Sequence, residues 1–272
     1  MPQHITGIDH LVILVGDLDA SAATYGALGF TISPRGMHSA HMGTGNHTIM
    51  LQDDYFELLA PLTPTEQNGP MRERLGGGDG LYATALRTDD AAGMHRELSD
   101  MGIGAAEPVD FQRPVDLPGG GTGEAAFRVT RIVEPGSPRD ELFGCQHLTR
   151  ETVWLPSLME HANGAVGILA VDAVAGDPAH AAEALAVLFG SEPQKDGAAV
   201  SLAAGDVALT IAPGDAGGRP FRLTGMTLGV SDIVKTKAAL SGTEYTEEGG
   251  AVVVPANAAH GVTITFKEEN RG

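Results

Sequence analysis

The sequence has little positive charge. Its 17 lysines and arginines stand against 35 aspartates and glutamates, which gives a formal net charge of −18 at pH 7. A surface of this sign repels the phosphate backbone of nucleic acids and the anionic headgroups of membranes. We therefore expect neither nucleic acid nor a membrane surface as a partner.

Cysteine is nearly absent as well, since Cys145 is the single one in 272 residues. One cysteine excludes a disulfide within the chain, so no feature of the sequence requires an oxidising compartment. The sequence also lacks the run of about 20 apolar residues that a membrane-spanning helix needs, and its first residues do not show the pattern of a secretion signal. These absences predict a cytoplasmic protein.

Aromatic residues make up 5% of the chain, whereas glycine is frequent, at 37 residues. This composition is typical of short elements joined by tight turns rather than of a few long helices. A chain of this length lies where one core usually divides into two. We expect two domains, residues 1–154 and 164–272.

The same order of elements recurs along the chain. In the first series a buried strand over residues 8–15 precedes a helix over 18–29, and three short strands follow: 30–35, 47–52 and 55–61. Similar series of strand, helix and strands begin near residues 80, 165 and 221. Because this internal repetition is visible without any alignment, it predicts four βαβββ modules.

Three stretches of sequence are distinctive together: GIDHLVILVGDLDASAATYGALGF (7–30), YFELLAP (55–61) and FGCQHLTRETVW (143–154). They resemble the vicinal oxygen chelate superfamily, and within it the glyoxalase-like branch. The resemblance implies an α+β fold in which four βαβββ modules form two cupped mixed sheets. It also implies a small-molecule substrate, because members isomerise, epimerise or oxidatively cleave small molecules, transfer thiols, or only sequester drugs.

The resemblance also assigns a metal site to the N-terminal half. The family's ligand positions fall on His10 in the first strand, Glu57 in the fourth strand and His147 in the fourth strand of the second module. Two imidazoles and one carboxylate suit a divalent ion such as Fe, and Zn, Mn, Ni or Co could also occupy such a site. Any of these side chains could instead be a buried structural group, since a lone histidine on an apolar strand often is.

The fourth ligand position departs from the family pattern. His10 lies seven residues before Asp17, and the same count back from Asp89 gives Tyr82. A phenol is an infrequent metal ligand, but it can serve as an acid or as a hydrogen-bond donor to a substrate. We therefore expect Glu57 and Tyr82 to be the catalytic residues.

The second half offers no comparable set. The matching positions there are Ala165, Gly225 and Leu209, none of which can bind a metal ion. We expect this half to complete the architecture without a polar site of its own.

Four further residues are candidates for substrate binding. Asn46 and His47 follow a loop rich in histidine and glycine that could line the mouth of the cup. Arg35 and Arg128 are the cations that we expect to hold an anionic group of the substrate.

Two classes of function remain open from the sequence. The first is a metal-assisted lyase or isomerase acting on a small oxygen-rich molecule, with a ring-cleaving dioxygenase as the other enzymatic possibility. The second is a metal-free protein of the same fold that binds or sequesters a small molecule, which the tyrosine at the fourth ligand position favours. In either case the protein would be a monomer or a homodimer.

Overall fold

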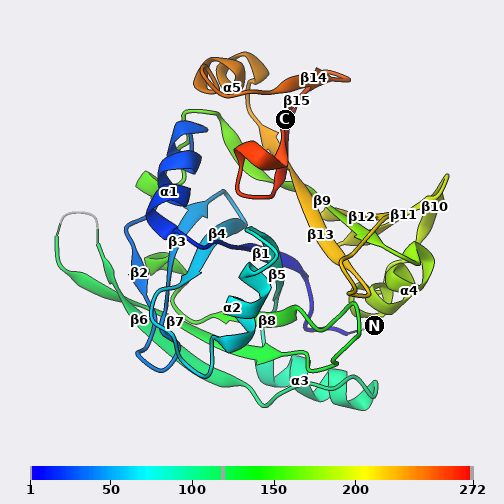
Figure 1. Ribbon diagram of the computed structural model, residues 1–272. Coiled ribbons are helices and arrows are strands. Elements are labelled where there is room, and N and C mark those ends of the chain that lie inside the picture. The colour runs from blue at the N-terminus through cyan, green and yellow to red at the C-terminus, as the bar shows by residue number, and fades with distance from the viewer. Residues whose placement is uncertain (1, 118–119, 270–272) are drawn as a thin grey trace.

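The computed structural model describes residues 2–117 and 120–269, so the expected outer ends of the two domains, residues 1 and 270–272, lie outside the described residues. The chain forms two eight-stranded mixed sheets, one from each half of the sequence (Figure 1). Among the described residues, none of the helices has the length and apolar character needed to cross a membrane.

The first half contains two βαβββ modules. The first comprises β1 (Gly7–Leu14), α1 (Leu18–Ala27), β2 (Gly36–Met37), β3 (Thr44–Met50) and β4 (Tyr55–Pro61). A short helix, α2 (Gly69–Leu75), precedes the second, which comprises β5 (Gly80–Arg87), α3 (Ala91–Asp100), β6 (Val109–Asp116), β7 (Thr122–Arg131) and β8 (Leu142–His147). The connection to the second half carries two single turns of 3-10 helix, Arg150–Thr152 and Pro156–Leu158.

The second half repeats this arrangement. Its first module comprises β9 (Ala165–Ala175), α4 (Pro178–Phe189), β10 (Gln194–Asp196), β11 (Ala199–Ala204) and β12 (Val207–Pro213). Its second module comprises β13 (Arg222–Val230), α5 (Ile233–Ala239), β14 (Thr246–Glu248), β15 (Ala251–Val254), a 3-10 turn over Ala256–Ala258 and β16 (Thr263–Glu268).

Both sheets have the same topology. The strand order is β2-β3-β4-β1-β5-β8-β7-β6 in the first and β10-β11-β12-β9-β13-β16-β15-β14 in the second. The first strands of the two modules lie side by side and antiparallel, and each is parallel to the fourth strand of its own module. The predicted fold of four βαβββ modules in two mixed sheets is confirmed.

An aspartate starts the principal helix of every module. The side chains of Asp17, Asp90, Asp177 and Asp232 each accept a hydrogen bond from a backbone N–H in the first helical turn, at 2.8 to 3.0 Å. This side-chain cap satisfies donors that have no partner within the helix. The capping aspartate is therefore the residue from which equivalent positions in the modules should be counted.

The expected strand over residues 30–35 is wrong. The structure has only the two-residue strand β2 at Gly36–Met37, and residues 30–35 form an irregular connection. Pro34 lies within this segment and has no backbone N–H to donate to a neighbouring strand.

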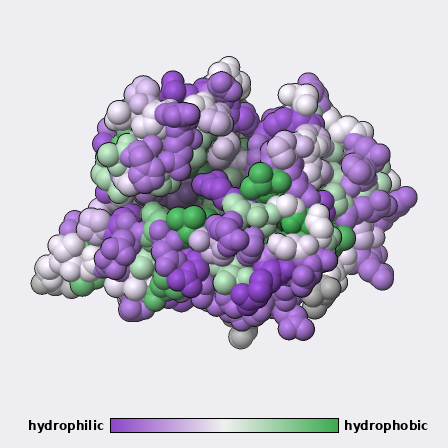
Figure 2. All heavy atoms as spheres, turned by 90° about the horizontal axis from the view of Figure 1, so that it is seen from below, coloured by the Kyte–Doolittle hydropathy of each residue, from purple (hydrophilic) through white to green (hydrophobic). Residues whose placement is uncertain are grey.

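The two sheets share one hydrophobic core. Leu11 and Phe56 from the first sheet belong to the same cluster of buried side chains as Val171 and Phe266 from the second. The strands of the first sheet end at His147 and those of the second begin at Ala165, but packing is continuous across that boundary. The outer surface is mostly hydrophilic on the face that Figure 2 shows, with hydrophobic residues in small groups.

Candidate metal centre

A β-bulge in β1 brings two consecutive polar side chains to the same face of the first sheet. The register between β1 and β5 shifts between Ile8 and His10, so that Asp9 is the extra residue. Ile8 and Leu11 on either side pack into the shared core, whereas Asp9 and His10 lie on the other face, inside the cup. A bulge is the ordinary way to place neighbouring residues on one side of a strand.

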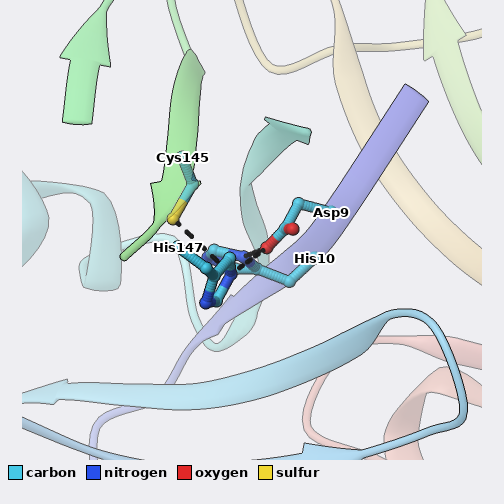
Figure 3. Close-up of side chains that lie close together, drawn as sticks. All are labelled: Asp9, His10, Cys145 and His147. Atoms are coloured by element: carbon cyan, nitrogen blue, oxygen red, sulfur yellow. Dashed lines mark hydrogen bonds and ion pairs between the residues drawn. The ribbon is translucent and has the colours of Figure 1, made fainter. Parts of the chain in front are cut away.

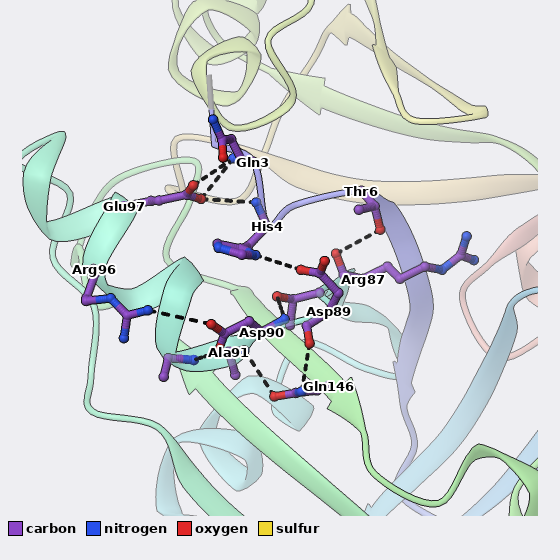
Figure 4. Close-up of polar contacts among 12 residues, drawn as sticks. Gln3, His4, Thr6, Arg87, Asp89, Asp90, Ala91, Arg96, Glu97 and Gln146 are labelled. Atoms are coloured by element: carbon purple, nitrogen blue, oxygen red, sulfur yellow. Dashed lines mark hydrogen bonds and ion pairs between the residues drawn. The ribbon is translucent and has the colours of Figure 1, made fainter.

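Strand β8 contributes the facing pair. Cys145 and His147 alternate with Gln146, so they point into the cup while Gln146 points away from it. Figure 4 shows how this outer face is fixed: Gln146 accepts a hydrogen bond from Ala91 N at 3.1 Å and donates to Asp89 O at 2.7 Å. The start of α3 therefore sets the position of β8 beside β5.

The Asp9 carboxylate contacts both imidazoles (Figure 3). Its Oδ1 is 2.7 Å from His10 Nδ1 and 2.9 Å from His147 Nε2, and Cys145 Sγ is 3.9 Å from His147 Nε2. Ligand atoms of all four residues lie within 4.8 Å of one another. We call Asp9, His10, Cys145 and His147 the polar cluster.

The polar cluster is buried, and its aspartate is ionised. Burial opposes ionisation of Asp9, but hydrogen bonds from His10 and His147 outweigh it and hold the pKa of Asp9 well below its usual range. Burial raises the pKa of Cys145, and the charges of Asp9 and Glu57 raise it further, so the sulfur carries its proton near neutral pH.

Aromatic rings enclose the polar cluster. The Tyr55 ring stacks on His10 with centroids 4.2 Å apart, and Phe143 meets His10 edge-on at 5.6 Å. Phe127 and Trp154 each contact His147 with centroids 4.9 Å apart. These rings limit access of water to the imidazoles.

Glu57 lies on the same interior face but outside the polar cluster. It is opposite Val12 of β1 and Thr48 of β3, and its Oε2 accepts a hydrogen bond from Asn46 Nδ2 at 2.5 Å. Its charge raises the pKa of Cys145, which places the carboxylate near the cluster. The structure therefore brings together His10 and His147 of the expected ligands, with Glu57 bonded to Asn46.

The prediction of Tyr82 at the fourth ligand position was counted from Asp89, which is not the residue that caps α3. Helix α3 is capped by Asp90 rather than by Asp89, so the residue equivalent to His10 is Ala83, seven positions earlier. Tyr82 is instead the counterpart of Asp9. Val12 pairs with Ala83 and Ile13 pairs with Leu81, so Tyr82 is the extra residue of a bulge in β5, as Asp9 is in β1. Burial raises the pKa of Tyr82, and its side chain lines a separate cavity with Met71 and Arg131.

The four expected substrate-binding residues lie in different places. Asn46 faces the interior beside Glu57, but His47 alternates to the opposite face, where its Nδ1 donates to Ser33 O at 2.7 Å. Arg35 pairs with Asp19 at the rim of the cup.

Arg128 points away from the cup. Its neighbours Phe127 and Val129 pack in the interior, while its guanidinium bonds Asp110 on the opposite face at 2.5 and 2.8 Å. The charge of Arg128 is thus paired at the surface, and its guanidinium does not face a molecule inside the cup.

The second sheet has no counterpart of the polar cluster in the part of the chain that the structure describes. Counting seven residues back from the capping aspartates gives Ala170 and Gly225, so Ala165 was misaligned. Leu209 is buried in the shared core, and its neighbour Thr210 lies on the face that corresponds to Glu57. No ligand set is formed at these positions.

The donor atoms present suit a divalent metal ion. Two polar atoms of the cluster, Asp9 Oδ2 and His147 Nδ1, are buried without a hydrogen-bond partner among the described residues. Asp9 Oδ2 forms an ion pair with Arg87 Nε at 4.0 Å, whereas His147 Nδ1 has no such contact and is free to bind a ligand. Imidazole nitrogen, carboxylate oxygen and sulfur are the donors that Zn, Fe, Mn, Ni and Co use in proteins.

Two members of the polar cluster, Asp9 and Cys145, are not among the residues predicted from the sequence. Asp9 follows an isoleucine and precedes His10, so simple alternation assigned it to the opposite face of the strand. Cys145 shares the parity of His147, which was a visible signal, but its reactivity could not be judged without its surroundings.

Comparisons with solved structures agree with this fold. A hypothetical protein from Staphylococcus aureus matches with a TM-score of 0.70 and 14% identity, covering 96% of this chain and 99% of that one. A variant of 4-hydroxymandelate synthase from Streptomyces coelicolor matches with a TM-score of 0.60 and 14% identity, over 99% and 95% of the two chains. The Mn(II)-bound glyoxalase from Novosphingobium aromaticivorans gives 0.56 and 14%, over 98% and 83%.

Identity this low shows a common fold and leaves activity open. No relative among curated proteins matches the sequence. The profile of one family, described as a glyoxalase-like domain, matches residues 8–189, more than half of the chain and all of the polar cluster. The protein therefore belongs to the glyoxalase-like domain family, within the vicinal oxygen chelate superfamily.

Proposed function

We propose that the protein is a metal-dependent lyase or isomerase of the glyoxalase type that acts on a small oxygen-rich molecule. The observation that carries this proposal is the polar cluster, in which ligand atoms of Asp9, His10, Cys145 and His147 lie within 4.8 Å of one another inside the cup. His10 and His147 would hold the ion, as the sequence predicts, with Asp9 and Cys145 as the adjacent donors. Zn, Fe, Mn, Ni or Co would fit these donors.

A divalent ion held there would act as a Lewis acid toward two vicinal oxygens of the substrate. Asp9 has an orienting role, because its Oδ1 is within hydrogen-bond distance of both imidazoles. A carboxylate bonded to a ligating histidine fixes the ring and its tautomer. Placing both rings against one carboxylate keeps them in a fixed relation before substrate arrives.

Glu57 is the residue that we assign to proton transfer. Asn46 Nδ2 bonds one oxygen of its carboxylate at 2.5 Å and so fixes its direction, while the other oxygen has no hydrogen-bond partner among the described residues. A carboxylate that is oriented but not fully paired can take a proton from a carbon next to a carbonyl and return it elsewhere. The aromatic rings around the polar cluster would keep bulk water from the charge that develops.

The Glu57→Gln variant tests this assignment. Glutamine has the same shape and can still accept from Asn46, so metal content and melting temperature should match the wild type. Loss of the base should lower turnover of a dicarbonyl or similar substrate by about 100-fold or more. Metal content measured by mass spectrometry and turnover of the metal-loaded protein check both expectations. Turnover within a few-fold of the wild type would remove Glu57 from the mechanism.

A ring-cleaving dioxygenase is the second enzymatic candidate. Two imidazoles and a carboxylate with open positions form the set that non-haem iron oxygenases use, and His10, His147 and Asp9 provide it. Oxygen consumption by the Fe(II)-loaded protein with a catechol distinguishes this reaction from isomerisation, which consumes none.

A metal-free binding protein is the candidate from the other class. The contacts of both imidazoles with Asp9 favour it, because they would satisfy part of the cluster without an ion. Purified protein that holds no metal ion and takes up none would support this alternative.

A further inference from the structure

A cavity opens at the rim of the cup, between strands β2 and β3 at one edge of the first sheet, strand β6 at the other edge, and the connection to the second half. Its volume is about 240 Å³, and Thr48 of β3, Arg113 and Val115 of β6, and Val153 and Leu158 of the connection line it. This is somewhat below the usual range of ligand pockets, which begins at about 300 Å³. The space fits a small molecule and excludes a large cofactor.

Two arginines line this cavity, and only one of them has a partner. Arg35 pairs with Asp19. Arg113 is partly buried and forms no hydrogen bond or ion pair with any described residue. The one carboxylate in the cavity lining, Asp116, is exposed and forms no ion pair with it.

The position of Arg113 in its strand points it inward. Phe111 and Val115, two residues away on either side along β6, pack in the interior cluster that also contains Tyr55 and Cys145. Alternation along the strand therefore places the Arg113 side chain on the same face. A cation with no carboxylate partner at the mouth of a pocket is unusual in a chain whose net charge is −18.

The cavity adjoins the proposed reaction site. Thr48, in its lining, lies opposite Glu57 in the β3–β4 register, and Val153 packs in the same cluster as Tyr55 and Cys145. Burial lowers the pKa of His38, the charge of Glu57 opposes that shift and the charge of Arg113 adds to it, so Glu57 and Arg113 both act on one imidazole. A molecule in the cavity would contact Arg113 and lie beside the strand pair that carries Glu57.

Gly36 gives the Arg113 side chain its room. A Cβ on Gly36 would lie 2.4 Å from Asn46 Oδ1 and 3.3 Å from the guanidinium carbon of Arg113. Asn46 bonds Glu57 through Nδ2, while its Oδ1 is buried and has no hydrogen-bond partner in the part of the chain that the structure describes. The amide thus lies between the proposed base and the unpaired cation.

We propose that Arg113 binds a carboxylate of the substrate, so that the substrate is a small anion carrying its vicinal oxygens at the end away from that carboxylate. The position of the substrate's vicinal oxygens rests on the proposed function. The negative charge of the substrate rests on Arg113 and the cavity. Guanidinium binds carboxylate through two parallel hydrogen bonds, which fixes the orientation of the molecule as well as holding it.

The test compares two probes of nearly the same shape, 3,4-dihydroxybenzoate and its uncharged amide, by calorimetric titration of the metal-loaded full-length protein. The wild type should bind the carboxylate at least about tenfold more tightly than the amide, since hydrogen bonds to charged groups are the stronger ones. Arg113→Gln should abolish that ratio, and Arg113→Lys should leave part of it. The control is Arg128→Gln, because Arg128 faces away from the cup, and it should keep the full ratio.

Two results would overturn the inference: an unchanged ratio in Arg113→Gln, or no binding of the carboxylate by the wild type at millimolar concentration. Melting temperatures of the variants check that each is folded. The same titration on metal-depleted protein separates this inference from the proposed function. A ratio that persists without metal and disappears in Arg113→Gln supports the anion site, even if the ion contributes nothing to binding.

Discussion

At the scale of single residues, a substitution of Gly36 measures how closely the side chains of Asn46 and Arg113 pack against it. A methyl group at this position would approach Asn46 Oδ1 to 2.4 Å, and Asn46 holds Glu57. We expect Gly36→Ala to lower the free energy of unfolding by about 1–3 kcal/mol, the usual cost of overpacking. Urea denaturation measures this change.

A second glycine serves as the matched control. Gly26 is in helix α1, and a Cβ there would meet nothing within 4 Å. Gly26→Ala should stabilise the protein by about 0.5–1 kcal/mol, because alanine favours a helix. Equal changes in the free energy of unfolding for the two substitutions would show that the space around Asn46 can accommodate a methyl group.

Only part of the candidate site could be predicted from the sequence. His10, Glu57 and His147 were expected in one site because they fall on the ligand positions that the family resemblance implies. Asp9 was not, because a bulge turns two consecutive residues to the same side and leaves no simple mark in the sequence. The partners of the arginines were equally hidden, since Asp110 and Asp19 come from other elements.

At the scale of elements, the regular parts of the modules were predictable and the irregular ones were not. Apolar strands and aspartate caps gave the βαβββ order correctly. Strand β6, with Pro114 and few apolar residues, has no clear strand pattern, so Arg113 could not be assigned to the interior. A one-residue error in the cap, Asp89 for Asp90, was sufficient to exchange Ala83 for Tyr82.

The connection between the halves contains a histidine whose protonation should weaken the fold. His161 Nδ1 accepts a hydrogen bond from Thr31 N at 3.0 Å and Nε2 donates to Met50 O at 2.8 Å, so the ring is held neutral. Burial lowers its pKa, although the bond to Met50 opposes this. The unfolded chain therefore binds the proton first as pH falls, and stability from His161 is complete above about pH 6.5 and lost below it.

His161→Gln should reduce this dependence on pH. Glutamine offers an acceptor and a donor without a titrating group, so the loss of unfolding free energy between about pH 7.5 and pH 5.5 should be smaller than in the wild type. The exposed His180 provides the control, and His180→Gln should follow the wild type. Identical pH slopes for wild type and His161→Gln would show that this ring does not couple protonation to folding.

At the scale of the whole molecule, the two halves should unfold together because they share a core and approach closely. Gly261 of the second half has φ +79°, and a Cβ there would lie 2.1 Å from Asp79 O of the first half. The adjacent His260 Nδ1 lies 2.7 Å from Asp79 Oδ2. We propose that the domains 1–154 and 164–272 are two sheets of one cooperative unit.

The contact between Gly261 and Asp79 can be measured by comparing the stabilities of the Gly261→Ala and Gly217→Ala variants. Gly217 has a similar φ, +67°, but nothing lies within 4 Å of its Cβ position, so its substitution reports backbone strain alone. Gly261→Ala should cost about 1–3 kcal/mol more, from the clash with Asp79. It should still give one unfolding transition, and two separate transitions in the wild type would contradict a single cooperative unit.

We expect the polar cluster to hold a divalent metal ion, and this is measured by metal binding to the purified protein. Protein dialysed with Zn, Mn, Fe(II), Ni or Co and freed of excess ion should retain about one equivalent of metal per chain. His147→Ala should retain far less, because it removes one of the two imidazoles, while His180→Ala should bind as the wild type does. Wild-type protein that retains none of these ions, or a His147→Ala variant that retains as much as the wild type, would show that the polar cluster is not a metal site.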